Sequence, residues 1–64
     1  MHFLEVTKMK LQILLKTLEN AGFYFVRHGG NHDVYSNGDI TIAIPRHREI
    51  NEILAKKILK EAGI

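Results

Sequence analysis

Apolar residues recur with helical spacing near the start of the chain. Four leucines stand at positions i, i+3, i+4 and i+7, which places them on one face of an α-helix. They are Leu11, Leu14, Leu15 and Leu18. Thr7 can cap this helix by accepting a hydrogen bond from a free backbone N–H, and Gly22 ends it because glycine adopts the left-handed conformation at no steric cost. The pattern predicts a helix over residues 7–20, with Ile13 off the apolar stripe and partly exposed.

The middle of the chain has the composition and turn signals of three β-strands. Residues 23–27 are aromatic and β-branched, residues 32–35 form a shorter run, and residues 40–44 alternate so that three isoleucines share one face. A glycine pair at 29–30 turns the chain between the first two strands. The Asn-Gly pair at 37–38 is a strong hairpin signal, because both central residues of such a turn need positive φ. Together these signals predict an antiparallel meander.

A second amphipathic helix is predicted at the end of the chain. Asn51 can cap it, and Glu52 in its first turn interacts favourably with the helix dipole. Residues 46–49, which precede it, are polar and are interpreted as a connection. The lysines of this helix are expected to point mostly outward. Its inner stripe is predicted to be Ile50, Ile53, Leu54 and Ile58.

The order of these elements predicts the fold class. Two amphipathic helices must bury their apolar stripes, and a three-stranded meander with one apolar face is the available partner. We therefore predict an α+β fold, an α-β-β-β-α two-layer sandwich with a three-stranded antiparallel sheet and both helices on one face. The same order occurs in double-stranded-RNA-binding domains, which by itself is an analogy of fold only.

Composition narrows the class of protein. The chain has 64 residues, enough for one small domain over residues 1–64. It contains no cysteine, which excludes disulfides and thiolate metal sites. No apolar run is long enough to span a membrane, and residues 1–6 lack the basic start and long apolar core of a signal peptide. We therefore expect a cytoplasmic protein without membrane attachment.

The placement of charge is more informative than its sum. A net charge of +2 permits a nucleic-acid partner without requiring one. In a meander, however, the first strand ends, the second begins and the third ends at one edge of the sheet. Basic side chains from these segments and from the start of the first helix are expected to gather there and to suit a phosphate backbone. They are Lys10, Arg27, His28, Arg46 and Arg48. A solvated surface is the alternative interpretation of each.

His32 begins the second predicted strand at this same edge. Imidazole exchanges a proton near neutral pH, so it can take one from a ribose 2′-hydroxyl or give one to a leaving 5′-oxygen. The alternative is a strand histidine that is merely exposed or hydrogen-bonded. The strand is too short to show which face His32 occupies, and its proton partner stays open between His28, His47 and Lys10. We predict no metal site, because a turn separates the two histidines at positions 28 and 32.

Several motifs that are weak individually are specific in combination. The leucine-rich helix runs into Gly22-Phe23, the triplet Gly30-Asn31-His32 begins the second strand, and residues 58–64 read Ile-Leu-Lys-Glu-Ala-Gly-Ile. Val26-Arg27 and the run Ile-Ala-Ile-Pro at 42–45 fit the same pattern. On these residues the chain resembles the HicA-type (YcfA-like) mRNA interferase toxins. The resemblance covers residues 9–64, so we expect these to form the toxin domain, with residues 1–8 as an N-terminal extension.

The resemblance implies a double-stranded-RNA-binding-like fold and ribosome-independent endoribonuclease activity. It implies a type II toxin–antitoxin module with a HicB-type antitoxin as partner. The family's catalytic histidine falls on His32, within the Gly-Asn-His triplet. The family often has Ser where this chain has Asn31, and many members have a second His where it has Asp33. A carboxylate at that position is expected to weaken RNA binding.

The leading hypothesis is therefore an mRNA-cleaving, metal-independent toxin that needs no cofactor. His32 would act as general acid or base, while the basic residues named above hold the RNA. We expect the free toxin to be a monomer and to form a hetero-oligomer with an antitoxin that covers the same edge. A non-catalytic double-stranded RNA-binding module is the first alternative, and a protein-interaction domain is the second.

Overall fold

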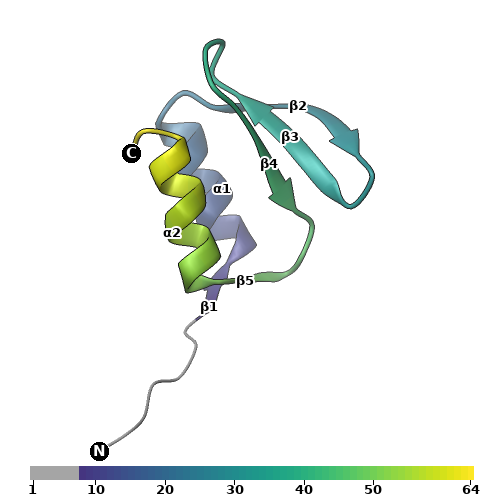
Figure 1. The fold of residues 1–64 in the computed structure, drawn as a ribbon, viewed down its shortest axis with the longest axis vertical. Helices are drawn as coiled ribbons and strands as arrows, with labels where there is room; N and C mark the ends of the chain where they lie inside the picture. The colour runs from purple at the N-terminus through teal and green to yellow at the C-terminus, as the bar shows by residue number, and fades with distance from the viewer. Residues whose placement is uncertain (1–7) are drawn as a thin grey trace, which may run out of the picture.

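Two helices lie on one side of a three-stranded antiparallel sheet in this computed structural model, which describes residues 8–64 (Figure 1). The sheet has the order β2-β3-β4, and β4 lies nearest to the helices. The predicted α+β architecture is confirmed, and a short pair of strands is added to it. The elements are β1 (Lys8–Lys10), α1 (Leu11–Asn20), β2 (Tyr24–Gly29), β3 (His32–Ser36), β4 (Thr41–Pro45), β5 (Glu49–Asn51) and α2 (Glu52–Glu61).

The added pair joins the start of the described chain to the segment before α2. β1 and β5 are antiparallel, and they form a two-stranded sheet of their own. The prediction of a helix from residue 7 is therefore wrong for residues 8–10, and the predicted cap at Thr7 lies outside the described residues. α1 begins at Leu11, whose backbone N–H donates to the carbonyl oxygen of Arg48 at 3.0 Å. Backbone groups that a longer helix would bond internally are bonded here to the segment around β5.

The hydrophobic core lies between the helices and the sheet. α1 contributes Leu14 and Leu18, both 0% exposed, as the leucine stripe predicted. Ile13 lies off this stripe and is 55% exposed, which is also as predicted. The isoleucines of β4 point inward, as the alternation of that strand predicted. The buried core residues are Leu14, Leu18, Phe23, Tyr35, Ile42, Ile44, Ile50, Ala55, Ile58 and Ala62.

α2 turns a different face inward from the one its pattern predicted. Asn51 caps it as predicted, and its side chain accepts a hydrogen bond at 2.7 Å from the backbone N–H of Ile53. Ile53 is 75% exposed and Leu54 is 39% exposed, so the prediction that they line the core is wrong. The cap and β5 fix where the helix starts, and the inward positions are then Ala55, Ile58 and Ala62, at i, i+3 and i+7. Within residues 8–64 neither helix has the length and hydrophobicity to cross a membrane.

The β3–β4 connection is longer than the predicted two-residue turn. Gly38 has a φ of 95°, but Asn37 does not have the positive φ that such a turn needs. Instead the side-chain oxygen of Asn37 accepts hydrogen bonds from the backbone N–H groups of Asp39 at 2.8 Å and Ile40 at 2.7 Å. Asparagine thus builds a four-residue loop by replacing backbone hydrogen bonds with side-chain ones.

The strand register assigns each side chain to one face of the sheet. Directly opposed residues share a face, and successive residues alternate. Tyr35 and Ile42 form such a pair, and both are buried, so they define the inner face toward the helices. Asp33 lies two residues before Tyr35 and is also on the inner face. His32 therefore lies on the opposite, outer face.

Candidate functional site

His32 stands at the tip of the β2–β3 hairpin, as the first residue of β3. It is exposed, and it is paired with Gly29 on β2 and with Pro45 on β4. The loop between the two strands is only Gly30 and Asn31, and Gly30 has the positive φ of 64° that so tight a turn requires. The question that the sequence left open is settled, because this ring points away from the helices.

Arg27 shares the outer face with His32. It pairs with Val34, one step along the face from the pair of Gly29 and His32. A Cβ built on Gly29 would lie 3.1 Å from Arg27 Nη1 and 3.9 Å from the backbone oxygen of His32. The guanidinium therefore extends over Gly29, into space that a side chain there would occupy. A cation and an exposed imidazole are thus neighbours on one open surface, an arrangement suited to an anion and a proton transfer.

A second cluster lies on the inner face of the same tip, around the carboxylate of Asp33. Asp33 Oδ1 lies 2.7 Å from Nδ1 of His28, which is directly opposite on β2, and 3.4 Å from Nε of Arg46. Arg46 also donates from Nη2 to the carbonyl oxygen of Gly30. The Asp33 side chain is only 18% exposed. His28 and Arg46 are thus engaged in holding the tip together, and they lie on the face opposite to His32.

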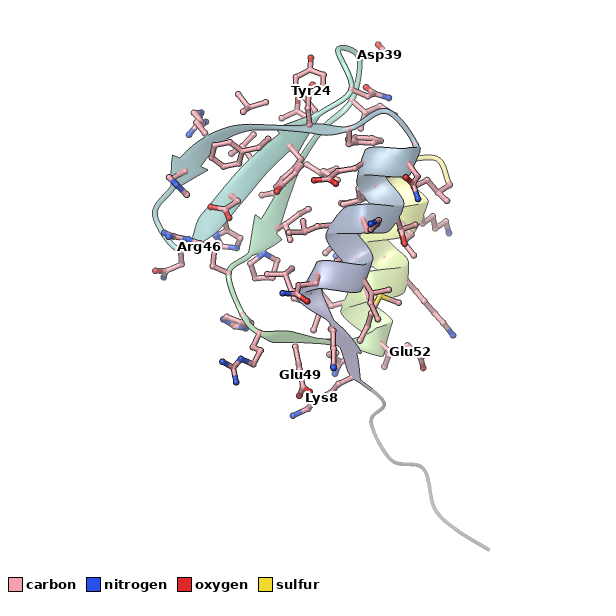
Figure 2. The ribbon with its side chains drawn as sticks, turned by 180° about the vertical axis from the view of Figure 1, so that it is seen from behind. Lys8, Tyr24, Asp39, Arg46, Glu49 and Glu52 are labelled. Atoms are coloured by element: carbon pink, nitrogen blue, oxygen red, sulfur yellow. The ribbon has the colours of Figure 1, made fainter. Side chains whose placement is uncertain are left out.

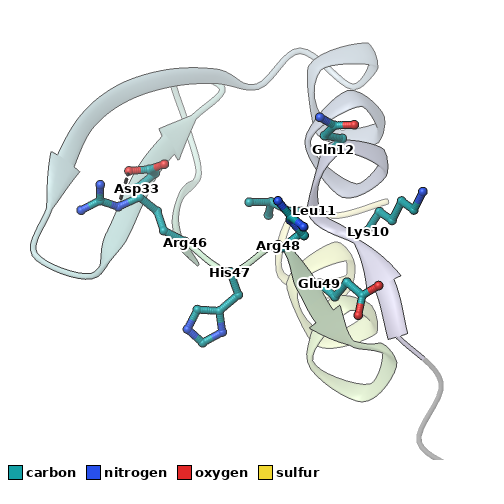
Figure 3. A pocket seen from close by; sticks show the side chains of 8 residues that line it. All are labelled: Lys10, Leu11, Gln12, Asp33, Arg46, His47, Arg48 and Glu49. Atoms are coloured by element: carbon teal, nitrogen blue, oxygen red, sulfur yellow. Dashed lines mark ion pairs between the residues drawn. The ribbon is translucent and has the colours of Figure 1, made fainter.

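An open groove of about 640 Å³ separates this inner cluster from the start of α1. Figure 3 shows Arg46 and Asp33 on one side of it, with Leu11, Gln12 and Arg48 on the other. Its volume is in the range of sites that bind small molecules. A smaller hollow, lined by Asn31, Arg46 and His47, adjoins it. The groove is lined by Lys10, Leu11, Gln12, Asp33, Arg46, His47, Arg48 and Glu49.

The predicted basic residues do reach one end of the molecule, but they divide into separate sets. Figure 2 shows Arg46 at this end of the sheet, and Tyr24 and Asp39 at the other. Arg27 is on the outer face with His32, and His28 is on the inner face with Asp33. The remaining three, Lys10, Arg46 and Arg48, line the groove.

Sequence reasoning missed Asp33 as the centre of the inner cluster, and it missed Gln12 and Glu49 in the groove. The first could have been found. A two-residue loop at 30–31 forces residue 29 to pair with residue 32 and residue 28 with residue 33, so His28 and Asp33 must face each other. Gln12 and Glu49 carried no such signal, because their positions depend on the β1–β5 pair. Within the described range of residues 8–64, no group of three or more His, Cys, Asp or Glu side chains could hold a metal ion.

Comparison with known proteins gives one match. Residues 12–64 match a family model described as the HicA toxin of bacterial toxin–antitoxin systems. The matched range contains His32, Arg27 and every element from α1 onward except the first residue of that helix. No curated protein and no solved structure matches the chain.

Proposed function

We propose, since this chain belongs to the HicA toxin family of bacterial toxin–antitoxin systems, that it is an endoribonuclease that cleaves mRNA and that His32 is its catalytic residue. One observation carries the proposal. His32 is exposed at the hairpin tip, on the same face as the guanidinium of Arg27, which extends over Gly29 opposite His32. This pair offers a proton carrier and a cation to one phosphodiester.

The proposed reaction is an internal transfer within the RNA. The ribose 2′-oxygen attacks the adjacent phosphorus, a new O2′–P bond forms, and the P–O5′ bond breaks. The products are a 2′,3′-cyclic phosphate and a free 5′-hydroxyl. A general base removes the 2′-hydroxyl proton and a general acid protonates the leaving 5′-oxygen, and each transfer contributes roughly 10²–10⁴-fold. The nucleophile belongs to the substrate, so we propose a reaction that needs neither a metal nor a cofactor.

In this scheme His32 performs one proton transfer and Arg27 stabilises the charge that develops on the phosphate. Of the three histidines within residues 8–64, only His32 is on the outer face of the sheet, since His28 is bound to Asp33 and His47 lines the groove. We therefore propose that solvent water exchanges the second proton, and that His28, His47 and Lys10 take no part in proton transfer.

The antitoxin partner follows from the same surface. We propose that the toxin acts as a monomer in the cytoplasm, where mRNA is found. We further propose that a HicB-type antitoxin inhibits it in a hetero-oligomer that covers His32 and Arg27. A partner with acidic groups facing Arg27 would exclude RNA by occupying the position of the phosphate.

The test is cleavage of RNA by purified protein in the presence of EDTA, with His32→Ala beside the wild type. The variant should lose cleavage and growth arrest, while its melting temperature stays near that of the wild type. Its antitoxin binding should also stay near that of the wild type, because His32 is one residue of the covered surface. Thr41→Ala, on the same face at the far end of the sheet, is the matched control and should cut normally. Cleavage by His32→Ala would refute the catalytic assignment, and loss of wild-type cleavage in EDTA would refute the metal-free scheme. Salt-dependent binding of duplex RNA without any cleavage would instead support the non-catalytic RNA-binding module.

A further inference from the structure

The groove beside α1 has the chemistry of a nucleotide site and lies outside the proposed catalytic pair. Its basic lining residues outnumber its acidic ones, and Asp33 is already paired with Arg46 and His28. No ion pair is found for Arg48 among residues 8–64. In Figure 3 its side chain lies beside Leu11 with Gln12 above, whereas Lys10 points away. A guanidinium, an amide and an apolar side chain thus line one wall, which offers groups for a phosphate, a base edge and a base face.

The groove is also continuous with the hairpin tip. The smaller hollow is lined by Asn31, Arg46 and His47, and the last two of these residues also line the groove. Asn31 is the residue directly before His32. A hollow surface therefore runs from the tip, past Arg46 and His47, to Arg48 and Gln12.

We propose that this groove binds the RNA chain beyond the cleaved bond, so that the toxin acts on extended single-stranded RNA. The proposal rests on the proposed function of His32. The path turns from the outer face, round Gly30 and Asn31, to the inner side of the tip. A single strand can follow such a turn with its bases unstacked, whereas an A-form duplex cannot. Arg48 contacts a backbone phosphate there, and Gln12 contacts a base edge.

The experiment compares two substrates of different length. A dinucleoside monophosphate reaches only the scissile bond, while a 12-nucleotide single strand reaches the groove. Arg48→Gln should lower kcat/KM for the 12-nucleotide RNA by about tenfold, the loss expected for one charge-assisted hydrogen bond, and mainly through KM. The loss for the dinucleotide should be at least about five times smaller, because that substrate gains nothing from the groove. Gln12→Ala should likewise lower kcat/KM more for the 12-nucleotide RNA than for the dinucleotide.

Salt dependence supplies a readout that a purely structural role would not move. The association constant K for single-stranded RNA falls as salt concentration rises. Because Arg48→Gln loses one phosphate contact, the magnitude of the slope of log K against log salt concentration should be smaller by about 0.7. Lys60→Gln, in the last turn of α2, removes a positive charge at the other end of that helix and should change neither the slope nor the length dependence. Equal losses on both substrates, or no loss on either, would overturn the proposal.

Further results distinguish this proposal from failure of the proposed catalytic function and from a groove that binds the antitoxin. If the wild type cuts neither substrate, the proposed function fails. Binding of a 12-nucleotide RNA with 2′-deoxyribose at the scissile position then tests by itself whether the groove binds RNA. Equal Kd values for the wild type and Arg48→Gln in that assay would refute the proposal that the groove binds RNA. If Arg48→Gln weakens antitoxin binding but leaves the Kd for RNA unchanged, the groove is a protein interface and the RNA proposal is wrong. Equal affinity for duplex and single strand would refute the strand preference.

Discussion

Asp33 and His28 face each other across the β2–β3 hairpin, with 2.7 Å between Oδ1 of the carboxylate and Nδ1 of the ring. The same oxygen lies 3.4 Å from Nε of Arg46, the residue after β4. One carboxylate thus connects β2 and β3 with the end of β4. Arg46 extends the connection to the loop, through its hydrogen bond to Gly30. Although this cluster is on the inner face, it fixes the tip on which His32 stands.

Replacing Asp33 with asparagine should therefore lower the rate of cleavage without unfolding the protein. Because His28 is exposed, the lost ion pairs are expected to cost only about 1 kcal/mol or less of unfolding free energy. The kcat should fall several-fold as the tip loses order, and KM should not rise, because a negative charge near RNA is removed. Urea unfolding and steady-state kinetics check both expectations. Asp39→Asn, at the opposite end of the sheet, is the control and should keep the wild-type kcat. A wild-type kcat in Asp33→Asn would show that the cluster does not position His32.

Gly29 provides a second test of the tip, because its missing side chain leaves room for Arg27. Gly29 is a strand residue without positive φ, so alanine can adopt its backbone conformation. The new Cβ would lie 3.1 Å from Nη1 of Arg27, which must then move away from its place beside His32. We expect Gly29→Ala to change stability by no more than about 1 kcal/mol and to reduce cleavage by up to about tenfold.

A double-mutant cycle shows whether this loss acts through Arg27. The variant with both Gly29→Ala and Arg27→Ala should cleave no more slowly than Arg27→Ala alone, because the group that Gly29→Ala displaces is then absent. Fully additive losses would mean that alanine disturbs His32 or the RNA directly. In that case Gly29 would have a role other than making room for the guanidinium.

The sequence was sufficient for the architecture because its strongest signals are local. The leucine stripe of α1, the alternation of β4 and the cap at Asn51 each depend on neighbouring residues. The β1–β5 pair could not be predicted this way. The three residues of β1 and the three of β5, which lie directly before α1 and α2, carry no strand pattern of their own, and only their meeting in space makes them a sheet. The same pair decides the face of α2, which is why Ile53 is exposed although its type suggested burial.

The candidate site was likewise predictable where it depends on local sequence, and not where it depends on how the strands pair. That basic residues gather at one end of the molecule depends only on strand direction, and the sequence predicted it. Which face each residue occupies depends on the register and on the bulge between Phe25 and Arg27. This bulge shifts the alternation of β2 so that Arg27 is outward and His28 inward. No pattern in the residues signals such an irregularity, so the two sets could not be separated in advance.

The cap of α2 allows a direct test of stability. The side-chain oxygen of Asn51 is the acceptor for the N–H of Ile53 at the start of the helix. Asn51→Ala should lower the unfolding free energy by about 1 kcal/mol, and Asn51→Asp should retain most of it. Denaturant unfolding checks this, with Asn20→Ala, at the last residue of α1, as the control. A domain of this size has a small margin of stability, so a loss of this size is also expected to lower Tm measurably.

The buried tyrosine of β3 predicts how stability depends on alkaline pH. Burial raises the pKa of Tyr35, and the negative charges of Glu19 and Asp33 raise it further. The fold therefore favours the neutral phenol. An unfolded tyrosine ionises near about pH 10, so below that pH both states are neutral and the contribution of Tyr35 is complete. As the pH rises above this value the unfolded state loses its proton first, and the unfolding free energy should fall.

Urea unfolding measured from about pH 8 to about pH 11 checks this fall, because this interval brackets the ordinary pKa of tyrosine, about 10. In Tyr35→Phe the part of the loss that comes from the phenol should disappear, so that the unfolding free energy changes less with pH than in the wild type. Tyr24→Phe removes an exposed phenol on β2 while keeping Tyr35, and it should retain the alkaline loss. A pH dependence that is the same in Tyr35→Phe as in the wild type would contradict the assignment of this loss to Tyr35.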